Sequence, residues 1–102
     1  MTTRFPSVEQ TKVVFTYCAP QATSVRLAGT FNEWSPEATP LTYAGDGEWA
    51  VWLMLAPGEY KYRFVVDGVW HADPLALESA ANPYGGMDSL LTVKMESAAE
   101  YI

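Results

Sequence analysis

The chain has 102 residues, which is enough for one hydrophobic core and too short for two domains. Its hydrophobic share of 49% and aromatic share of 14% exclude an intrinsically disordered chain. The 12 acidic residues outnumber the 6 basic ones and give a formal net charge of −6, which argues against nucleic acid and anionic membranes as partners.

Apolar and polar residues alternate with period two, which predicts short strands from the N-terminal third onward. Residues 12–18 form the first predicted strand, a run of β-branched and aromatic side chains. Residues 24–29 form the second, with Val25 and Leu27 on one face. Residues 1–10 precede both strands and are interpreted as a polar N-terminal extension.

The middle of the chain predicts two longer strands and a hairpin. Residues 48–55 carry apolar side chains at alternate positions, and residues 59–66 place three aromatic rings on one face. An Asp-Gly pair at positions 67 and 68 follows at once, which is a strong signal for a two-residue hairpin turn. The return strand is predicted over residues 69–71.

The last predicted strand spans residues 89–94, and residues 96–102 are interpreted as a C-terminal tail. Clusters of Gly, Pro, Asn and Ser between the strands indicate turns at residues 32–36, 44–47, 56–58 and 82–86. About six or seven short strands without a long helix predict one all-β domain over residues 11–95, an antiparallel β-sandwich of immunoglobulin-like type.

Cys18 is the single cysteine, so the chain forms no internal disulfide. It falls in an apolar strand, and we expect a buried structural thiol rather than a nucleophile. The first residues lack the pattern of a secretory signal, and no apolar run approaches the ~18 residues of a membrane-spanning helix. Together with the lone cysteine, these features lead us to expect a cytoplasmic protein.

Residues that carry chemistry are sparse. His71 is the only histidine, and neither a nucleophile motif nor a phosphate-binding glycine loop occurs. Asp67, Asp73 and Asp88 could supply the carboxylate pair of a glycosidase, but Asp67 and Asp73 fit turn positions better. We therefore expect no enzyme activity, no cofactor and no metal site.

Two tryptophans are not explained by the predicted core. Trp34 falls in a turn, and Trp70 follows the hairpin turn two residues later. Arg63 lies on the strand face opposite the core, near the strand that carries Trp70. Exposed indole rings beside a cation suit a sugar, whose apolar C–H face packs on the ring while its hydroxyls take hydrogen bonds. The alternative is that both rings only cap the ends of the sandwich.

Two sequence runs favour sugar binding: VRLAGTFNEW at residues 25–34 and GEYKYRFVVDGVWHADP at residues 58–74. They resemble the glycogen-binding domain of AMP-activated protein kinase β subunits. That domain belongs to carbohydrate-binding module family 48, whose relatives include the early-set N-terminal domains of isoamylases and branching enzymes. The resemblance covers residues 11–95 and implies that Gly29 and Asn32 shape the first turn.

The resemblance implies a non-catalytic module that recognises α-1,4-linked glucans, such as glycogen or starch, by stacking sugars on tryptophans. Trp34 and Trp70 match the family's two binding tryptophans. Arg63 stands where the family has a lysine, Tyr84 where the kinase subunits have a leucine, and Asp88 where they have an asparagine. An open site of this kind implies micromolar to millimolar affinity for a single site, which a polymer ligand raises by multivalency.

Other functions remain open at this stage. An early-set domain can serve as a scaffold without binding sugar, or as the N-terminal module of an α-glucan-active enzyme. Ala50, Trp52 and Met54 form an apolar set on the face opposite Trp49, where a two-layer sandwich usually carries polar groups. This set suggests a contact surface for a second copy of the chain or for a partner protein. Lys61 stays outside the expected sugar site.

Overall fold

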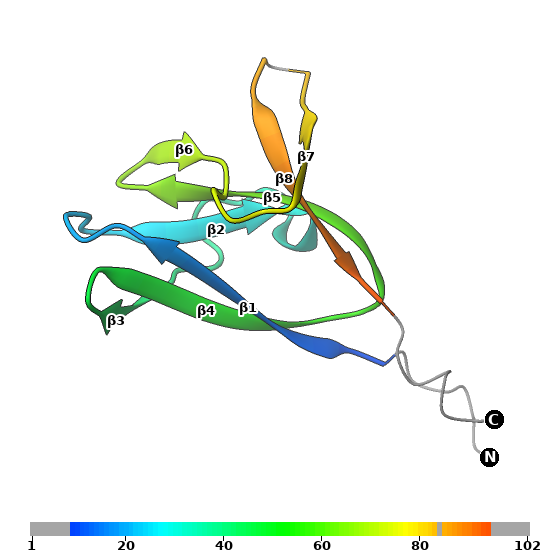
Figure 1. Cartoon of the computed structure of the whole chain (residues 1–102), viewed down its shortest axis with the longest axis horizontal. Coiled ribbons are helices and arrows are strands. Elements are labelled where there is room, and N and C mark those ends of the chain that lie inside the picture. The colour runs from blue at the N-terminus through cyan, green and yellow to red at the C-terminus, as the bar shows by residue number, and fades with distance from the viewer. Residues whose placement is uncertain (1–8, 84, 95–102) are drawn as a thin grey trace.

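Two antiparallel sheets face each other in the computed structural model, which describes residues 9–83 and 85–94 (Figure 1). The smaller sheet has the strand order β1 (Thr11–Cys18), β4 (Glu48–Leu55), β3 (Thr42–Gly45). The larger has the order β2 (Val25–Gly29), β5 (Gly58–Val66), β8 (Met87–Val93), β7 (Glu78–Ala81), and β6 (Val69–His71) also pairs with β5. A short 3₁₀ turn, η1 (Thr30–Asn32), follows β2. The predicted all-β sandwich is confirmed.

Two strands were not predicted from the sequence. β3 and β7 have four residues each, TYAG and ESAA, and neither shows the alternation that indicates a strand. They exist because β4 and β8 offer them backbone partners, which is a tertiary effect that local sequence does not carry. Most of the predicted extension over residues 1–10 and the whole tail over 96–102 lie outside the described residues.

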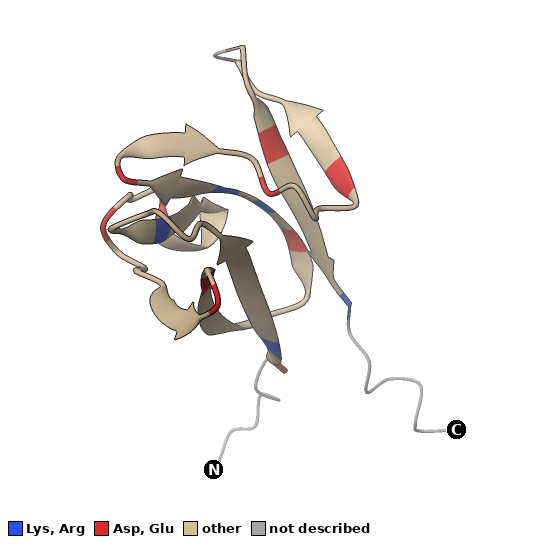
Figure 2. Cartoon of the chain, turned by 60° about the vertical axis from the view of Figure 1, so that its left-hand side comes forward, with Lys and Arg blue, Asp and Glu red and all other residues tan. Residues whose placement is uncertain are grey.

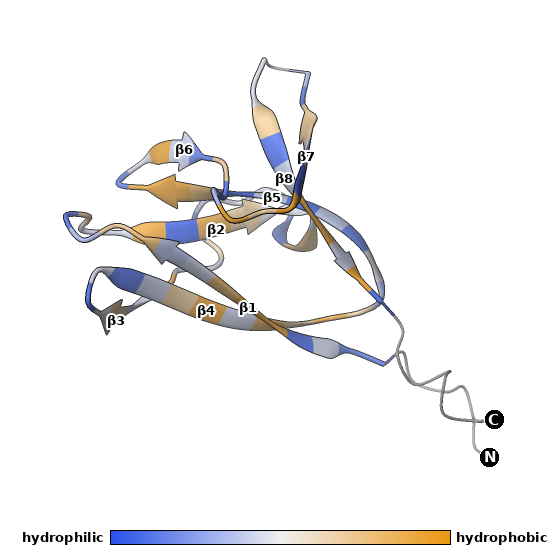
Figure 3. Ribbon diagram, viewed as in Figure 1, coloured by the Kyte–Doolittle hydropathy of each residue, from blue (hydrophilic) through white to orange (hydrophobic). Residues whose placement is uncertain are grey.

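The core lies between the sheets, where alternate residues of β2 and β5 pack against Phe15 of β1 and Leu55 of β4. Val25, Leu27 and Phe64 are at most 1% exposed, and the ring of Phe15 meets that of Tyr62 edge-on at a centroid distance of 5.2 Å. Figure 3 shows the matching pattern along β2, where a hydrophilic band separates hydrophobic ones. The opposite face of β5 is therefore directed away from the core, and that face carries the site described below.

Two of the aspartates considered for catalysis hold the fold together. Asp67 has a left-handed backbone with φ of 48° in the β5–β6 turn, and its Oδ1 accepts hydrogen bonds from the backbone N–H groups of Thr23 (2.9 Å) and Ser24 (2.8 Å). Asp73 accepts a hydrogen bond of 2.5 Å from the Tyr62 hydroxyl. The expectation that both are structural residues is confirmed.

The Tyr62–Asp73 contact also changes how Tyr62 titrates. Burial, then the hydrogen bond to Asp73 and its negative charge, raises the pKa of Tyr62 well above the ordinary tyrosine value of 10.0. The Asp73 backbone N–H donates to Ser89 Oγ at 2.9 Å, so the segment after β6 is tied to both β5 and β8.

The prediction of a buried Cys18 is wrong, because this side chain is exposed. β1 places Phe15 in the core, and side chains an even number of residues away from Phe15 share that direction. Cys18 is an odd number away and lies on the outer face with Val14, which is 58% exposed. Because both faces of this strand carry apolar side chains, its composition did not show which face is buried.

Candidate functional site

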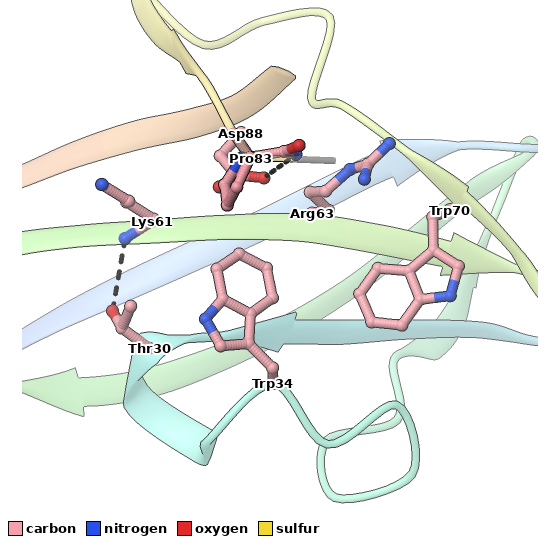
Figure 4. Close-up of a pocket in the computed structure, with 8 residues that line it drawn as sticks. Thr30, Trp34, Lys61, Arg63, Trp70, Pro83 and Asp88 are labelled. Atoms are coloured by element: carbon pink, nitrogen blue, oxygen red, sulfur yellow. Dashed lines mark hydrogen bonds between the residues drawn. The ribbon is translucent and has the colours of Figure 1, made fainter. Parts of the chain in front are cut away.

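An open groove of about 830 Å³ lies on the outer face of β5 (Figure 4). It is lined by side chains from η1 and its following turn, from β5, β6 and β8, and from the connection between β7 and β8: Thr30, Trp34, Lys61, Arg63, Trp70, Asn82, Pro83, Asp88. The structure thus brings together four of the five predicted site residues. The fifth, Tyr84, lies outside the described residues.

Asn32 builds the turn that presents Trp34. Its side-chain oxygen accepts a hydrogen bond from Gly29 N–H at 3.0 Å, and its Nδ2 donates to Leu27 O at 2.9 Å and to Thr39 Oγ1 at 3.0 Å. These bonds support the start of the turn. Its backbone is unusual, because Glu33 and Trp34 both have left-handed φ values, 58° and 60°. Such a conformation costs about 1–2 kcal/mol for an ordinary residue. The turn therefore holds strain where Trp34 enters the groove.

Gly29 makes the close approach of this turn to β5 feasible. A Cβ atom at this position would lie 2.5 Å from the backbone oxygen of Lys61 and 2.7 Å from the Phe31 ring, which is too close for either contact. The Gly29 carbonyl in turn accepts a hydrogen bond of 2.8 Å from Trp34 N–H. The expectation that Gly29 and Asn32 shape the turn is confirmed.

Trp70 reaches the same groove from the hairpin. It pairs with Val65 across β5 and β6, and cross-strand neighbours point to the same side of a sheet, here the side of Arg63. The rings of Trp34 and Trp70 lie with their centroids 6.4 Å apart and their planes inclined by 36°. Trp70 is 37% exposed and Trp34 is half-buried, so both rings offer surface to the groove. They form one angled aromatic platform.

Polar groups form the wall beyond the platform. The Arg63 guanidinium lies 6.0 Å from the centroid of the Trp70 ring, and its Nε is buried without a hydrogen-bond partner. Asp88 is only 7% exposed, and its Oδ1 accepts a hydrogen bond of 3.0 Å from Asn82 Nδ2. Asn82 in turn accepts from Gly86 N–H at 3.0 Å, which closes the β7–β8 connection around the wall.

The sequence interpretation missed four lining residues: Thr30, Lys61, Asn82 and Pro83. For Lys61 a signal existed, because it lies two residues before Arg63 on the same face of a predicted strand. Asn82 and Pro83 indicated only a turn. Their place in the groove depends on the pairing of β7 with β8, which was not predicted.

Within residues 9–83 and 85–94, no group of three or more His, Cys, Asp or Glu side chains is placed to hold a metal ion. The same residues include no helix that is long and apolar enough to cross a membrane. A sandwich with two tilted indole rings over a polar-walled groove is the arrangement of a carbohydrate-binding module.

Comparison with known proteins agrees with this class. The model of the family described as the glycogen recognition site of AMP-activated protein kinase matches residues 11–99, and the chain belongs to this family. Among solved structures, the maltogenic amylase of S. marinus superimposes with a TM-score of 0.69 at 30% sequence identity, covering 82% of this chain and 14% of the amylase chain.

Relatives of known sequence include both plant and animal proteins. Protein FLOURY ENDOSPERM 6 of Oryza sativa subsp. japonica, a chloroplastic protein, is 32% identical over 87 residues, which is 85% of this chain and 16% of the rice protein. The 5'-AMP-activated protein kinase subunit beta-1 of Sus scrofa is 37% identical over 70 residues, which is 69% of this chain and 54% of the subunit sequence. The chain thus corresponds to one part of each of these proteins.

Proposed function

We propose that the groove binds α-1,4-linked glucans, such as glycogen or starch chains, without catalysing a reaction on them. The observation that carries this proposal is the pair of Trp34 and Trp70 rings, 6.4 Å apart and inclined by 36°, beside the polar wall. An α-1,4-linked glucan is curved, so an angled pair of rings suits consecutive sugar units better than a flat surface. Membership in a glycogen-recognition family supports the same ligand.

Each part of the groove has a distinct role in this proposal. The apolar C–H faces of two sugar units pack on Trp34 and Trp70. The Arg63 guanidinium donates to sugar hydroxyls through its terminal nitrogens, since its Nε is buried. Asp88 accepts from a hydroxyl while Asn82 holds its carboxylate in place. Tyr84, which lies outside the described residues, remains a sugar contact predicted from the resemblance.

The positions of the carboxylates favour a binding function over glycoside hydrolysis. Asp67 and Asp73 are engaged in the hydrogen bonds that hold the fold, and Asp88 is held by Asn82. A glycosidase needs two carboxyl groups on opposite sides of the scissile bond, about 5–9.5 Å apart. In the described part of the groove, Asp88 is the one carboxylate among the lining residues.

The test is a titration of intrinsic tryptophan fluorescence with β-cyclodextrin and maltoheptaose. Trp34→Ala and Trp70→Ala should each weaken binding by about five- to 150-fold, because each removes one stacking surface worth roughly 1–3 kcal/mol. Trp52→Ala is the matched control, since it removes an indole from the other sheet. Binding that is equal in all four proteins would contradict the proposal.

A second function is favoured by a separate surface, the outer face of the β1–β4–β3 sheet. Val14 and Trp52 are paired across β1 and β4 and are 58% and 56% exposed, and Met54 is 45% exposed. This apolar face is separate from the groove, and we propose that it contacts a second copy of the chain or a partner protein. Light scattering would show a dimer that Trp52→Lys dissociates. A monomer at high protein concentration would exclude self-association.

A further inference from the structure

β6 and β8 pair with the same edge of β5 and separate from each other beside Arg63. β8 pairs with residues 58–62 of β5 and β6 pairs with residues 64–66, whereas β2 takes the opposite edge. The start of β8, which carries Asp88, pairs with β7 instead, and Figure 2 shows this hairpin projecting from the rest of the molecule. The groove lies over this junction of β5, β6 and β8, because Trp70 belongs to β6, Asp88 to β8 and Arg63 to the part of β5 between them.

Asp73 links the three strands at this junction. It comes two residues after the end of β6, and its backbone N–H donates a hydrogen bond of 2.9 Å to the Oγ of Ser89 in β8. Its carboxylate accepts a hydrogen bond of 2.5 Å from the hydroxyl of Tyr62, the last residue of β5 that pairs with β8. The same carboxylate accepts from Leu75 N–H at 2.9 Å, which holds it in place.

The hydrogen bonds of Asp73 lie on the core side of the sheet, opposite the groove. Its partners Tyr62 and Ser89 are paired across β5 and β8 and are 5% and 0% exposed. Their neighbours in sequence, Arg63 and Asp88, line the groove. Because successive side chains of a strand point to opposite faces, a sugar in the groove does not reach Asp73. Any effect of Asp73 on binding must therefore pass through the strands that it links.

The distance between β6 and β8 depends on this link. β6 has three residues, and its described pairing is with β5 rather than with β8, so no backbone ladder joins the two strands. Resting on the proposed function, we propose that Asp73 is a positioning residue of the glucan site. It sets the separation between Trp70 on β6 and Asp88 on β8, and thus between the aromatic platform and the polar wall. A sugar chain then meets both without paying to order the strands.

The test removes the contacts of Asp73 and leaves the lining residues in place. Ser89→Ala removes the acceptor of the Asp73 N–H, and Asp73→Ala removes the carboxylate that accepts from Tyr62. Each should weaken maltoheptaose binding by about two- to tenfold, the loss of about one hydrogen bond between wall and sugar. Asp73→Asn keeps an acceptor for Tyr62 and should restore most of the affinity. Tyr60→Phe is the matched control, because it removes a tyrosine hydroxyl that donates to Ala56 O at the other end of β5.

A merely structural role of Asp73 would lower the free energy of unfolding without changing the Kd, because a protein that is still almost entirely folded keeps its affinity. Urea unfolding therefore accompanies each titration and gives the folded fraction. The indole N–H signal of Trp70 in the sugar-free protein is the second measurement, by nuclear magnetic resonance. This signal should shift in Ser89→Ala and Asp73→Ala and should stay in place in Tyr60→Phe, which should also keep the wild-type Kd.

The outcomes separate this inference from the proposed function. A wild-type Kd and an unmoved Trp70 signal in folded Ser89→Ala would overturn the positioning role and leave glucan binding standing, even if Asp73→Ala fails to fold. Equal weakening by Tyr60→Phe would show a general loosening of the sandwich and would also overturn it. Failure of the wild-type protein to bind maltoheptaose would overturn both proposals.

Discussion

Asn32 is predicted to be the residue on which the position of Trp34 depends. Asn32→Ala removes an acceptor for Gly29 N–H and two donors, to Leu27 O and Thr39 Oγ1. At a net value of about 0.5–1.5 kcal/mol for each hydrogen bond, the free energy of unfolding should fall by about 2–4 kcal/mol. The left-handed backbone at Glu33 and Trp34 would also lose its support, so Trp34 should leave the groove and glucan affinity should fall about tenfold.

Urea unfolding and glucan titration on the same protein measure the two effects of Asn32→Ala. Trp34→Ala is the comparison, because it removes the stacking ring and leaves the three hydrogen bonds of Asn32 in place. It should weaken glucan binding by about five- to 150-fold, with a smaller loss of stability than Asn32→Ala. An Asn32→Ala protein with wild-type stability and wild-type affinity would refute the view that this side chain organises the turn.

Two further predictions concern the residues around β5. Gly29→Ala should lower the free energy of unfolding by about 1–3 kcal/mol, because its Cβ would lie 2.5 Å from the Lys61 carbonyl oxygen; an unchanged urea midpoint would show that the turn has room to move. The raised pKa of Tyr62, caused mainly by burial, makes stability fall at alkaline pH. Above about pH 10 the unfolded chain releases the tyrosine proton while the folded protein keeps it, so stability should drop by up to about 1.4 kcal/mol per pH unit until the folded group titrates. Tyr62→Phe should be less stable than wild type at neutral pH and should lack this part of the decline. A stability difference between the two proteins that stays constant above pH 10 would contradict the assignment of the decline to Tyr62.

The strands with strong alternation could be predicted from the sequence because burial decides which side chains they carry. In β5, Tyr62 and Phe64 face the core as the period of two requires. β3 and β7 could not be predicted, since their stability comes from a neighbouring strand rather than from their own residues. The exposure of Cys18 could not be predicted either, because an apolar composition does not show which face of a strand is covered.

The groove was partly predictable for a related reason. Trp34 and Trp70 stood out because a turn and a hairpin end are poor places to bury an indole, and Arg63 because it lies opposite the core face. These side chains lie together because of the left-handed turn after η1, and no single residue type predicts such a turn. Asn82 could not be predicted as a site residue, because its contact with Asp88 forms only when β7 and β8 pair.

The central claim, that Trp34 and Trp70 form a glucan-binding platform, is tested most directly by nuclear magnetic resonance. The chain has 4 tryptophans, and each gives one indole N–H signal that can be followed as maltoheptaose is added. Trp49, whose indole donates a hydrogen bond to Ala19 O at 3.0 Å, and Trp52 on the other sheet act as internal references. We predict saturable shifts for Trp34 and Trp70 and little change for the other two. Unchanged Trp34 and Trp70 signals at millimolar sugar, or a response confined to Trp52, would contradict the claim.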